Sequence, residues 1–180
     1  MAKVVSTWSA TEGTGYGLVP VRVHVLLARG EPGISTARPL GSFSAPRVAW
    51  ALEAIGAGLP GRLVADMSPG DAHHDMEGAH LAVAAAAMAL SGKLDEELLD
   101  RSMFTGDLLV NGEVKQPFPW RKICAAAESV GAEPVLAASL SDLPRALGAD
   151  RAPAAREAFE RSLSAARGTA GAPSPRAMGM

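Results

Sequence analysis

The chain has 180 residues, 48% hydrophobic and only 4% aromatic, with a formal net charge of −2 from 17 basic and 19 acidic side chains. This length and composition fit one domain with an aliphatic core, and the lack of a concentrated basic face argues against nucleic acid as a partner. The single Cys124 cannot form an internal disulfide, and no leader pattern or long apolar run occurs, so we expect a cytoplasmic protein without a membrane partner.

The first 40 residues are predicted to form mainly β-strands. Alternation of apolar residues with small or polar ones predicts strands over residues 2–9, 19–28 and 34–37. Between the first two lies Gly13-Thr14-Gly15-Tyr16-Gly17, a glycine-rich sequence of the kind found in phosphate-binding turns. We interpret it as a turn between strands, because the chain contains no GxxxxGK[ST] motif and no helix is predicted after it.

The first helix signal is Ser44-Ala45-Pro46, in which a serine N-cap precedes a proline in the first turn. Apolar residues then recur at helical spacing, at Val48, Ala51, Leu52 and Ile55. A strand is predicted over 62–67. The alanine-rich stretch 79–91 predicts a buried helix, because alanine lets a helix backbone lie close to a sheet.

The remaining elements are shorter and lie nearer the end of the chain. They are predicted as a hairpin joining 102–109 to 113–115, a helix over 121–130 and a strand over 134–138. Asn111-Gly112 is the signal for the hairpin, since this dipeptide favours the tight turn between two strands. Cys124 stands at an apolar position of the predicted helix, so we expect it in the core rather than in a reactive role.

The chain divides into one domain and a C-terminal extension. We expect the domain over residues 1–148 and a C-terminal helix within 149–167. The helix is predicted from one apolar face within 152–167, formed by Ala155, Ala158, Phe159, Leu163 and Ala166. The proline- and glycine-rich segment 168–180 is predicted to be disordered, because it has too little apolar surface to offset its ordering entropy.

The polar loop before the alanine-rich helix holds the densest group of chemically active side chains. Its candidate metal ligands are His73, His74, Asp75, Glu77 and His80, which offer the nitrogen and oxygen atoms that zinc binds. Against a metal site, adjacent histidines usually point apart. The same loop could instead supply a general base to a hydrolase, through His74, Glu77 or His80, with Lys122 as a further candidate.

Five segments together resemble one known family. They are Arg29-Gly30 with Pro32-Gly33-Ile34, Arg47 to Leu52, Val64 to Asp71, Ala82 to Gly92, and Phe104 to Leu108 with Gly112-Glu113-Val114. In this order and at these gaps, they resemble the N-terminal domain of magnesium-chelatase-like AAA+ proteins of the bacterial competence type. That domain is similar to the proteolytic domain of Lon proteases. The resemblance implies an α+β fold of the ribosomal protein S5 domain 2 type, with a mixed sheet and packed helices.

The chain departs from the family's catalytic pattern at both positions of the serine–lysine dyad. The position of the nucleophilic serine falls on Glu77 or Gly78, neither of which can form an acyl-enzyme with a protein substrate in the usual way. The position of the lysine falls on Arg121, whose guanidinium keeps its proton and cannot act as general base. Lys122 is adjacent but faces about 100° further round a helix. The phosphate loop of the family's ATPase module does not occur either.

The resemblance and these departures together predict a non-catalytic domain without a cofactor. Its expected role is protein interaction or assembly, either with a separate AAA+ ATPase or with copies of itself. A peptidase-like hydrolase and a metal-binding protein that uses the loop from His73 to His80 stay open as alternatives.

Overall fold

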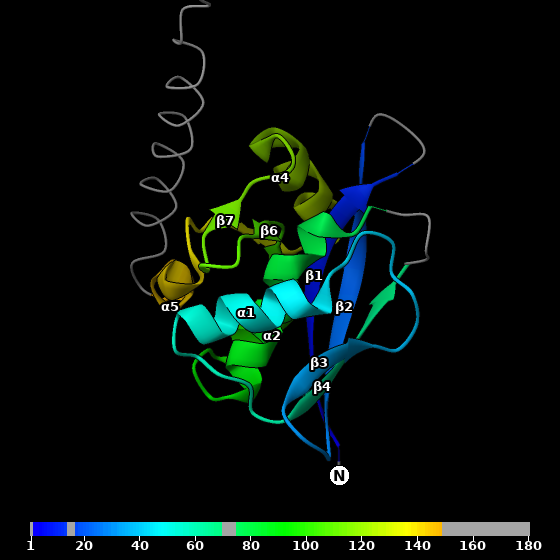
Figure 1. The fold of residues 1–180 in the computed structure, drawn as a ribbon. Helices are drawn as coiled ribbons and strands as arrows, with labels where there is room; N and C mark the ends of the chain where they lie inside the picture. Colours follow the sequence, from blue (N-terminus) through cyan, green and yellow to red (C-terminus); the bar gives the residue numbers. More distant parts are fainter. Residues whose placement is uncertain (1, 14–16, 70–74, 149–180) are drawn as a thin grey trace, which may run out of the picture.

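The computed structural model describes residues 2–13, 17–69 and 75–148, and its central feature is a six-stranded mixed sheet with the order β3-β4-β2-β1-β5-β8 (Figure 1). The strands are β1 (Lys3–Glu12), β2 (Leu18–Ala28), β3 (Gly33–Thr36), β4 (Arg62–Ser68), β5 (Ser102–Phe104) and β8 (Glu133–Val135). The β1–β2 and β2–β4 pairs are antiparallel, and the other three pairs are parallel. A separate antiparallel pair joins β6 (Asp107–Leu108) to β7 (Val114–Lys115).

Five α-helices accompany the sheet in the described residues. They are α1 (Ala45–Ala54), α2 (His80–Leu90), α3 (Glu96–Asp100), α4 (Trp120–Ser129) and α5 (Leu143–Leu147). Short 3₁₀ turns precede two of them, η1 (Glu77–Ala79) before α2 and η2 (Leu140–Asp142) before α5. The expectation of an α+β fold with a mixed sheet and packed helices is confirmed. Within the described ranges, no helix has the length and apolar character needed to cross a membrane.

Helix α1 begins where the sequence predicts it. The Ser44 hydroxyl accepts a hydrogen bond from the Arg47 backbone N–H at 3.4 Å, and this satisfies one of the N–H groups that a helix start leaves unpaired. Val48, Ala51 and Leu52 are buried, as the helical spacing of the apolar residues indicates. The helix therefore presents this face to the core and its opposite face to solvent.

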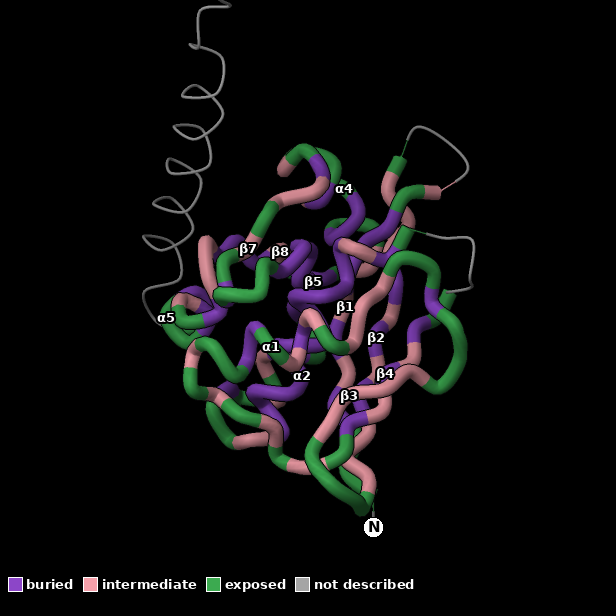
Figure 2. The backbone as a smooth tube through the Cα atoms, in the orientation of Figure 1, coloured by how far each residue is buried: buried purple, intermediate pink, exposed green. Residues whose placement is uncertain are grey.

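Helix α2 is the centre of the core. All eleven of its residues are buried (Figure 2), and it contacts β1 and β2 as well as α1. Six of the eleven are alanines, from Ala82 to Ala89, which allow these neighbours to approach the helix backbone closely. The predicted burial of residues 79–91 is confirmed for this helix, and only Ser91 at its end is half-exposed.

Strand β1 separates two apolar clusters. Successive side chains of a strand point to opposite faces, and Val5 belongs to the main cluster around α2, whereas Ala10 belongs to a second cluster with Ile123 and Ala127 of α4. Trp8 packs against this second cluster as well. Helices α2 and α4 therefore cover opposite faces of the sheet at β1.

Three local expectations differ from the structure. Residues 102–104 do not form one arm of a hairpin with 113–115 but enter the main sheet as β5, parallel to β1 and β8, so only Asp107–Leu108 pairs with β7. The helix predicted over 121–130 runs from Trp120 to Ser129. Cys124 is half-buried instead of lying in the core, and partial burial raises the pKa of its thiol. The expected C-terminal helix in 149–167 and the tail 168–180 lie outside the described residues.

Candidate functional site

Two hydroxyls of β1 hold the backbone of the loop that leads into α2. Ser9 Oγ donates to the Gly78 carbonyl at 3.1 Å, and Thr11 Oγ1 donates to the Asp75 carbonyl. The Gly106 N–H donates to the same Gly78 carbonyl at 2.8 Å. Both hydroxyl residues are buried. The segment that carries the candidate catalytic positions is thus fixed to the sheet through its backbone.

The Asp75 carboxylate ties this loop to the loop before α1. Its Oδ1 accepts from the Ser42 hydroxyl at 2.6 Å and from the Glu77 N–H at 3.0 Å. Ser42 Oγ in turn accepts from the Met76 N–H at 3.1 Å. Asp75, predicted as a candidate metal ligand, therefore has a structural role in the described geometry, as a link between two loops.

Gly78 occupies a position with no room for a side chain. A Cβ atom built there would lie 2.8 Å from the Ala10 carbonyl oxygen, 3.1 Å from Phe118 Cε2 and 3.2 Å from Thr105 Cγ2. The first neighbour is backbone of β1, which cannot move without disturbing the sheet. Gly78 is buried and the neighbouring Glu77 half-buried. Of the two positions that the sequence resemblance offers for a nucleophile, Gly78 is thus enclosed by protein atoms.

Thr105 is the chemically interesting residue that the sequence interpretation missed. Its side chain is buried, and its hydroxyl has no hydrogen-bond partner among the described residues. The Phe118 ring, also buried, lies over Gly78 beside the Thr105 methyl group. A hydroxyl enclosed in this way lacks the base and the open approach that a nucleophile requires. No local sequence signal marks Thr105, because its surroundings come from three distant segments.

His80 is fully buried, and both of its ring nitrogens are used. Nδ1 lies 2.7 Å from the Glu77 carbonyl oxygen and 2.9 Å from Asp107 Oδ1, while Nε2 accepts from the Ser44 N–H at 2.8 Å. The ring stacks on Phe43, with centroids 4.8 Å apart. Because Nε2 is an acceptor, the proton of the neutral ring sits on Nδ1. Burial lowers the pKa of His80 against the opposing effects of the Glu77 carbonyl and Asp107.

The partner of His80 is itself part of an ion pair. Asp107 accepts from Arg47 Nη1 at 2.9 and 3.1 Å, through its two carboxylate oxygens. Its Oδ1 also accepts from the Leu108 N–H at 2.8 Å. The network joins α1, α2 and β6 around one carboxylate. Since no lone pair of the imidazole is left free, His80 is placed to hold these elements together and not to bind a metal or accept a substrate proton.

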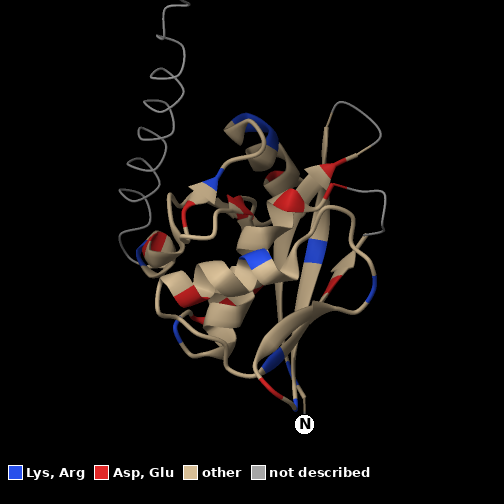
Figure 3. Ribbon diagram, in the orientation of Figure 1, with Lys and Arg blue, Asp and Glu red and all other residues tan. Residues whose placement is uncertain are grey.

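The basic residues proposed for the second dyad position lie on the surface. Arg121 and Lys122 are both exposed in the first turn of α4, where Figure 3 shows a basic cluster. The buried Phe118, which precedes this helix, fills the space above Gly78. Over the rest of the molecule, acidic and basic residues are interspersed (Figure 3). The geometry thus brings Gly78 and Phe118 together and leaves Arg121 and Lys122 facing solvent.

The candidate metal ligands are only partly described. Among residues 2–13, 17–69 and 75–148, no group of three or more His, Cys, Asp or Glu residues is arranged to hold a metal ion. Asp75, Glu77 and His80 make the protein contacts given above. His73 and His74 lie outside the described residues.

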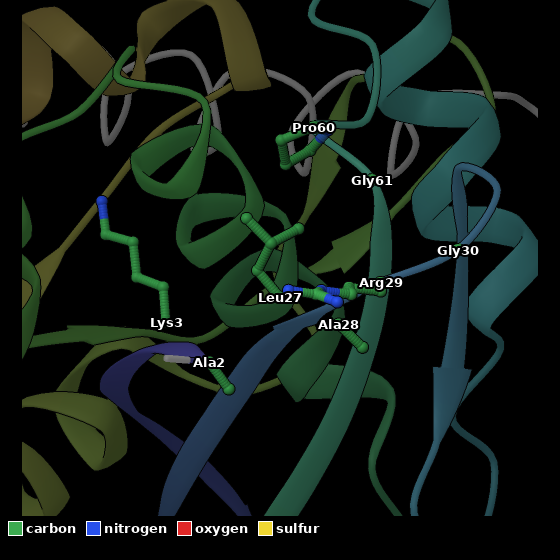
Figure 4. A pocket seen from close by; sticks show the side chains of 8 residues that line it. All are labelled: Ala2, Lys3, Leu27, Ala28, Arg29, Gly30, Pro60 and Gly61. Carbon is green, nitrogen blue, oxygen red and sulfur yellow. The ribbon is translucent and has the colours of Figure 1, made fainter.

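One open cavity of about 550 Å³ lies at the other end of the sheet (Figure 4). Lys3, Leu27, Arg29 and Gly61 are among its lining residues, and Lys3 forms an ion pair with Glu96. Ser9 is six positions after Lys3 along an extended strand, which corresponds to about 20 Å. This cavity therefore has no part in the loop that carries Gly78.

A small apolar surface lies beside α1. Trp50, Leu109 and Val110, here called the apolar patch, are 56%, 43% and 58% exposed. The 109–112 turn packs on α1, since a Cβ at Gly112 would lie 2.7 Å from Ile55 Cγ2. Trp50 is an exposed residue of α1, the helix on which this turn packs.

Comparisons with known proteins do not assign this geometry to a family. No protein-family model matches the chain, and no curated protein matches it either.

Proposed function

We propose that this protein is a non-catalytic domain of the magnesium-chelatase-like, Lon-like type that acts in protein interaction or assembly. The proposed partner is a separate AAA+ ATPase or further copies of the chain. The five segments that carry the family resemblance support this proposal, because they fall in order on the β2–β3 turn, α1, β4, α2 and the β5–β6–β7 region. The proposed fold is accordingly that of ribosomal protein S5 domain 2.

The packing around Gly78 is the observation that carries the non-catalytic part of the proposal. An acyl-transfer enzyme needs a nucleophile with an open approach and a neutral base next to it. At Gly78, one of the two matching positions, Ala10, Thr105 and Phe118 leave no space even for a Cβ atom. The other, Glu77, carries a carboxylate in place of a hydroxyl. Arg121 is exposed and keeps its proton, so it supplies no base.

The hydrolase and metal-binding alternatives both lose one of their candidate residues. Both count His80 among several candidates, yet Ser44 and Asp107 occupy its two ring nitrogens inside the core. A carboxylate base would have to be Glu77, which is half-buried and stands at the start of η1.

The apolar patch supports the interaction part of the proposal. Trp50 of α1 and Leu109 and Val110 of the turn that packs on α1 are large exposed apolar residues, while the charged residues of the described chain are mixed in sign. Aromatic residues in such positions are typical anchors of protein interfaces, and removal of one often costs about 2 kcal/mol of binding free energy or more.

The first test concerns catalysis. We expect the purified chain neither to cleave an unfolded casein-like substrate, with or without ATP, nor to react with serine-directed probes. Cleavage that disappears in Glu77→Gln or Lys122→Ala would show that another catalytic pair operates, and would refute the proposal.

The second test concerns assembly. We expect tagged chain to recover a AAA+ ATPase, or its own untagged copies, from source cells, and Val110→Asp to abolish that recovery. Val4→Asp is the matched control, because Val4 is 52% exposed but lies in β1 away from the patch. Equal recovery by both variants would remove the apolar patch from the proposal.

A further inference from the structure

Strand β3 forms one margin of the six-stranded sheet, and among the residues that the structure describes it pairs only with β4. The N–H groups of Gly33 and Ala37 donate to carbonyls in or next to β4, at 3.3 and 2.9 Å. Successive residues of a strand direct their backbone polar groups to alternate sides, so Ile34 and Thr36 direct theirs away from β4. β3 therefore presents two N–H groups and two carbonyls at the margin of the sheet.

The opposite margin of the sheet is protected against pairing, whereas β3 is not. There the Glu133 N–H donates to the Arg101 carbonyl at 2.8 Å, so the next residue, Pro134, faces away from β5 and has no N–H to offer. Charged residues and proline are common means by which proteins keep edge strands from pairing with other chains. The sequence of β3, Gly-Ile-Ser-Thr, contains neither.

The chain carries opposite charges at the two ends of this edge. Glu31 precedes β3 and forms no ion pair with another described residue. Arg38 follows β3, and its side chain is 47% exposed although its Nε donates to Asp66 at 3.0 Å. An open hollow of about 440 Å³ adjoins the strand, and its lining residues are Glu31, Gly33, Ile34, Ser35 and Arg62. The edge is thus accessible, acidic at its start and basic at its end.

We propose that β3 pairs antiparallel with β3 of a second copy of the chain, so that the two sheets continue as one across a twofold axis at Ser35. This inference rests on the proposed function, because it assigns a surface to assembly with further copies. In this register Ile34 of each copy pairs with Thr36 of the other, and each pair exchanges two N–H···O bonds. A twofold interface uses the same surface on both copies.

The charges at the ends of the edge favour a second copy in this orientation. Antiparallel pairing brings Glu31 of each copy to the end at which Arg38 of the other lies, whereas parallel pairing would join like charges. The interface is short, because β3 has 4 residues and a standard stable interface has about 20–30 residues a side. We therefore expect a weak, reversible dimer, which calls for covalent trapping.

Ser35 provides the trap. Its polar backbone groups face β4, so the two Ser35 residues form a non-hydrogen-bonded antiparallel pair, with Cα atoms about 4.5 Å apart, a distance that a disulfide spans. In the full chain with Cys124→Ser, mild oxidation of Ser35→Cys should give several-fold more covalent dimer than the same treatment of Val4→Cys. Val4 is the matched control, because it is 52% exposed but lies in β1, away from the margin.

Two sets of variants in the Ser35→Cys chain test the contacts themselves. Thr36→Pro removes an N–H that faces away from β4, so it should lower trapping several-fold, whereas Thr36→Val keeps this N–H and should not. If circular dichroism shows that Thr36→Pro impairs folding, charge variants decide. Glu31→Arg and Arg38→Glu should each lower trapping, and an equimolar mixture of the two should restore it as mixed dimers, because opposite charges then meet at both ends.

Three results would overturn the inference. They are equal trapping of Ser35→Cys and Val4→Cys, trapping that none of these variants changes, and a mixture of the two charge variants that traps no better than either alone. The measurements use the purified chain, and Val110→Asp should leave trapping unchanged. Failure of the β3 pairing is therefore distinguishable from failure of the apolar patch to recover an assembly partner.

Discussion

Gly78 offers the sharpest test of whether its surroundings leave room for a side chain, because alanine adds only one methyl group there. In Gly78→Ala the added Cβ would meet the Ala10 carbonyl oxygen at 2.8 Å, nearer than real Cβ contacts come, and the Phe118 ring at 3.1 Å. Overpacking of a well-packed core typically costs about 1–3 kcal/mol. Replacing glycine by alanine at the start of a helix returns up to about 1 kcal/mol through lower chain entropy. The difference between these terms is about 0–3 kcal/mol, and because the closest neighbour is strand backbone we expect Gly78→Ala to lose roughly 1–2 kcal/mol of unfolding free energy.

Urea denaturation followed by circular dichroism measures this loss directly, and a thermal scan should show a Tm lower by about 2–4 °C per kcal/mol. Gly33→Ala is the matched control, since a Cβ at Gly33 would meet no atom within 4 Å. Its unfolding free energy should stay equal or rise slightly. If Gly78→Ala proved as stable as the Gly33 variant, the site would have room for a side chain, and the argument against catalysis from packing would fail.

Three further predictions concern the core and its polar network. Burial lowers the pKa of His80 in the folded protein, so as pH falls below about 6.5 the unfolded chain takes up a proton at His80 more readily than the folded chain does. Unfolding free energy should thus decrease as pH falls from about 6.5 toward 5, by at most about 1.4 kcal/mol per pH unit, and an equal pH dependence in His80→Gln would contradict this. Asp107→Asn should lower the unfolding free energy by about 2 kcal/mol, because it weakens the charge-assisted hydrogen bonds to Arg47, and the urea midpoint measures this decrease. Ala85→Leu should cost about 1–3 kcal/mol in the same assay, since Ala85 is fully buried; unchanged stability would mean that α2 is not tightly packed.

The elements with local signals were predictable from sequence. Helix α1 follows from Ser44, Pro46 and the helical spacing of its apolar residues, and the structure has the same start and the same buried face. The alanine content of α2 predicted its burial, because only small side chains allow close contact on all sides of a helix. In both cases the physical cause lies within about a dozen neighbouring residues.

The polar interior could not be predicted, because its partners are distant in sequence. Thr7, Ser9 and Thr11 give β1 a hydrophilic appearance, yet all three are buried and bond to backbone carbonyls at least 64 positions away. The sequence suggests His80 as a metal ligand or catalytic base, because the residues next to it do not indicate that Ser44 and Asp107 bind its two ring nitrogens. The Asn111-Gly112 turn was found, but the pairing of β5 with β1 depends on residues about a hundred positions apart.

The buried hydroxyls of β1 also impose an order on the folding of this chain. Strands β1 and β2 can pair as a hairpin as soon as both have been synthesised, because their register involves only residues 3–27. Thr7, however, donates to the carbonyls of Leu99 and Ser102, so its hydroxyl must stay hydrated until those residues emerge from the ribosome. Apolar side chains at the same positions would make the exposed face of the hairpin more prone to aggregate during that interval. The hydroxyls of Thr7 and Ser9 therefore keep part of this face hydrophilic in the nascent hairpin, and they hydrogen-bond to the carbonyls of Gly78, Leu99 and Ser102 once those residues have folded onto the strand.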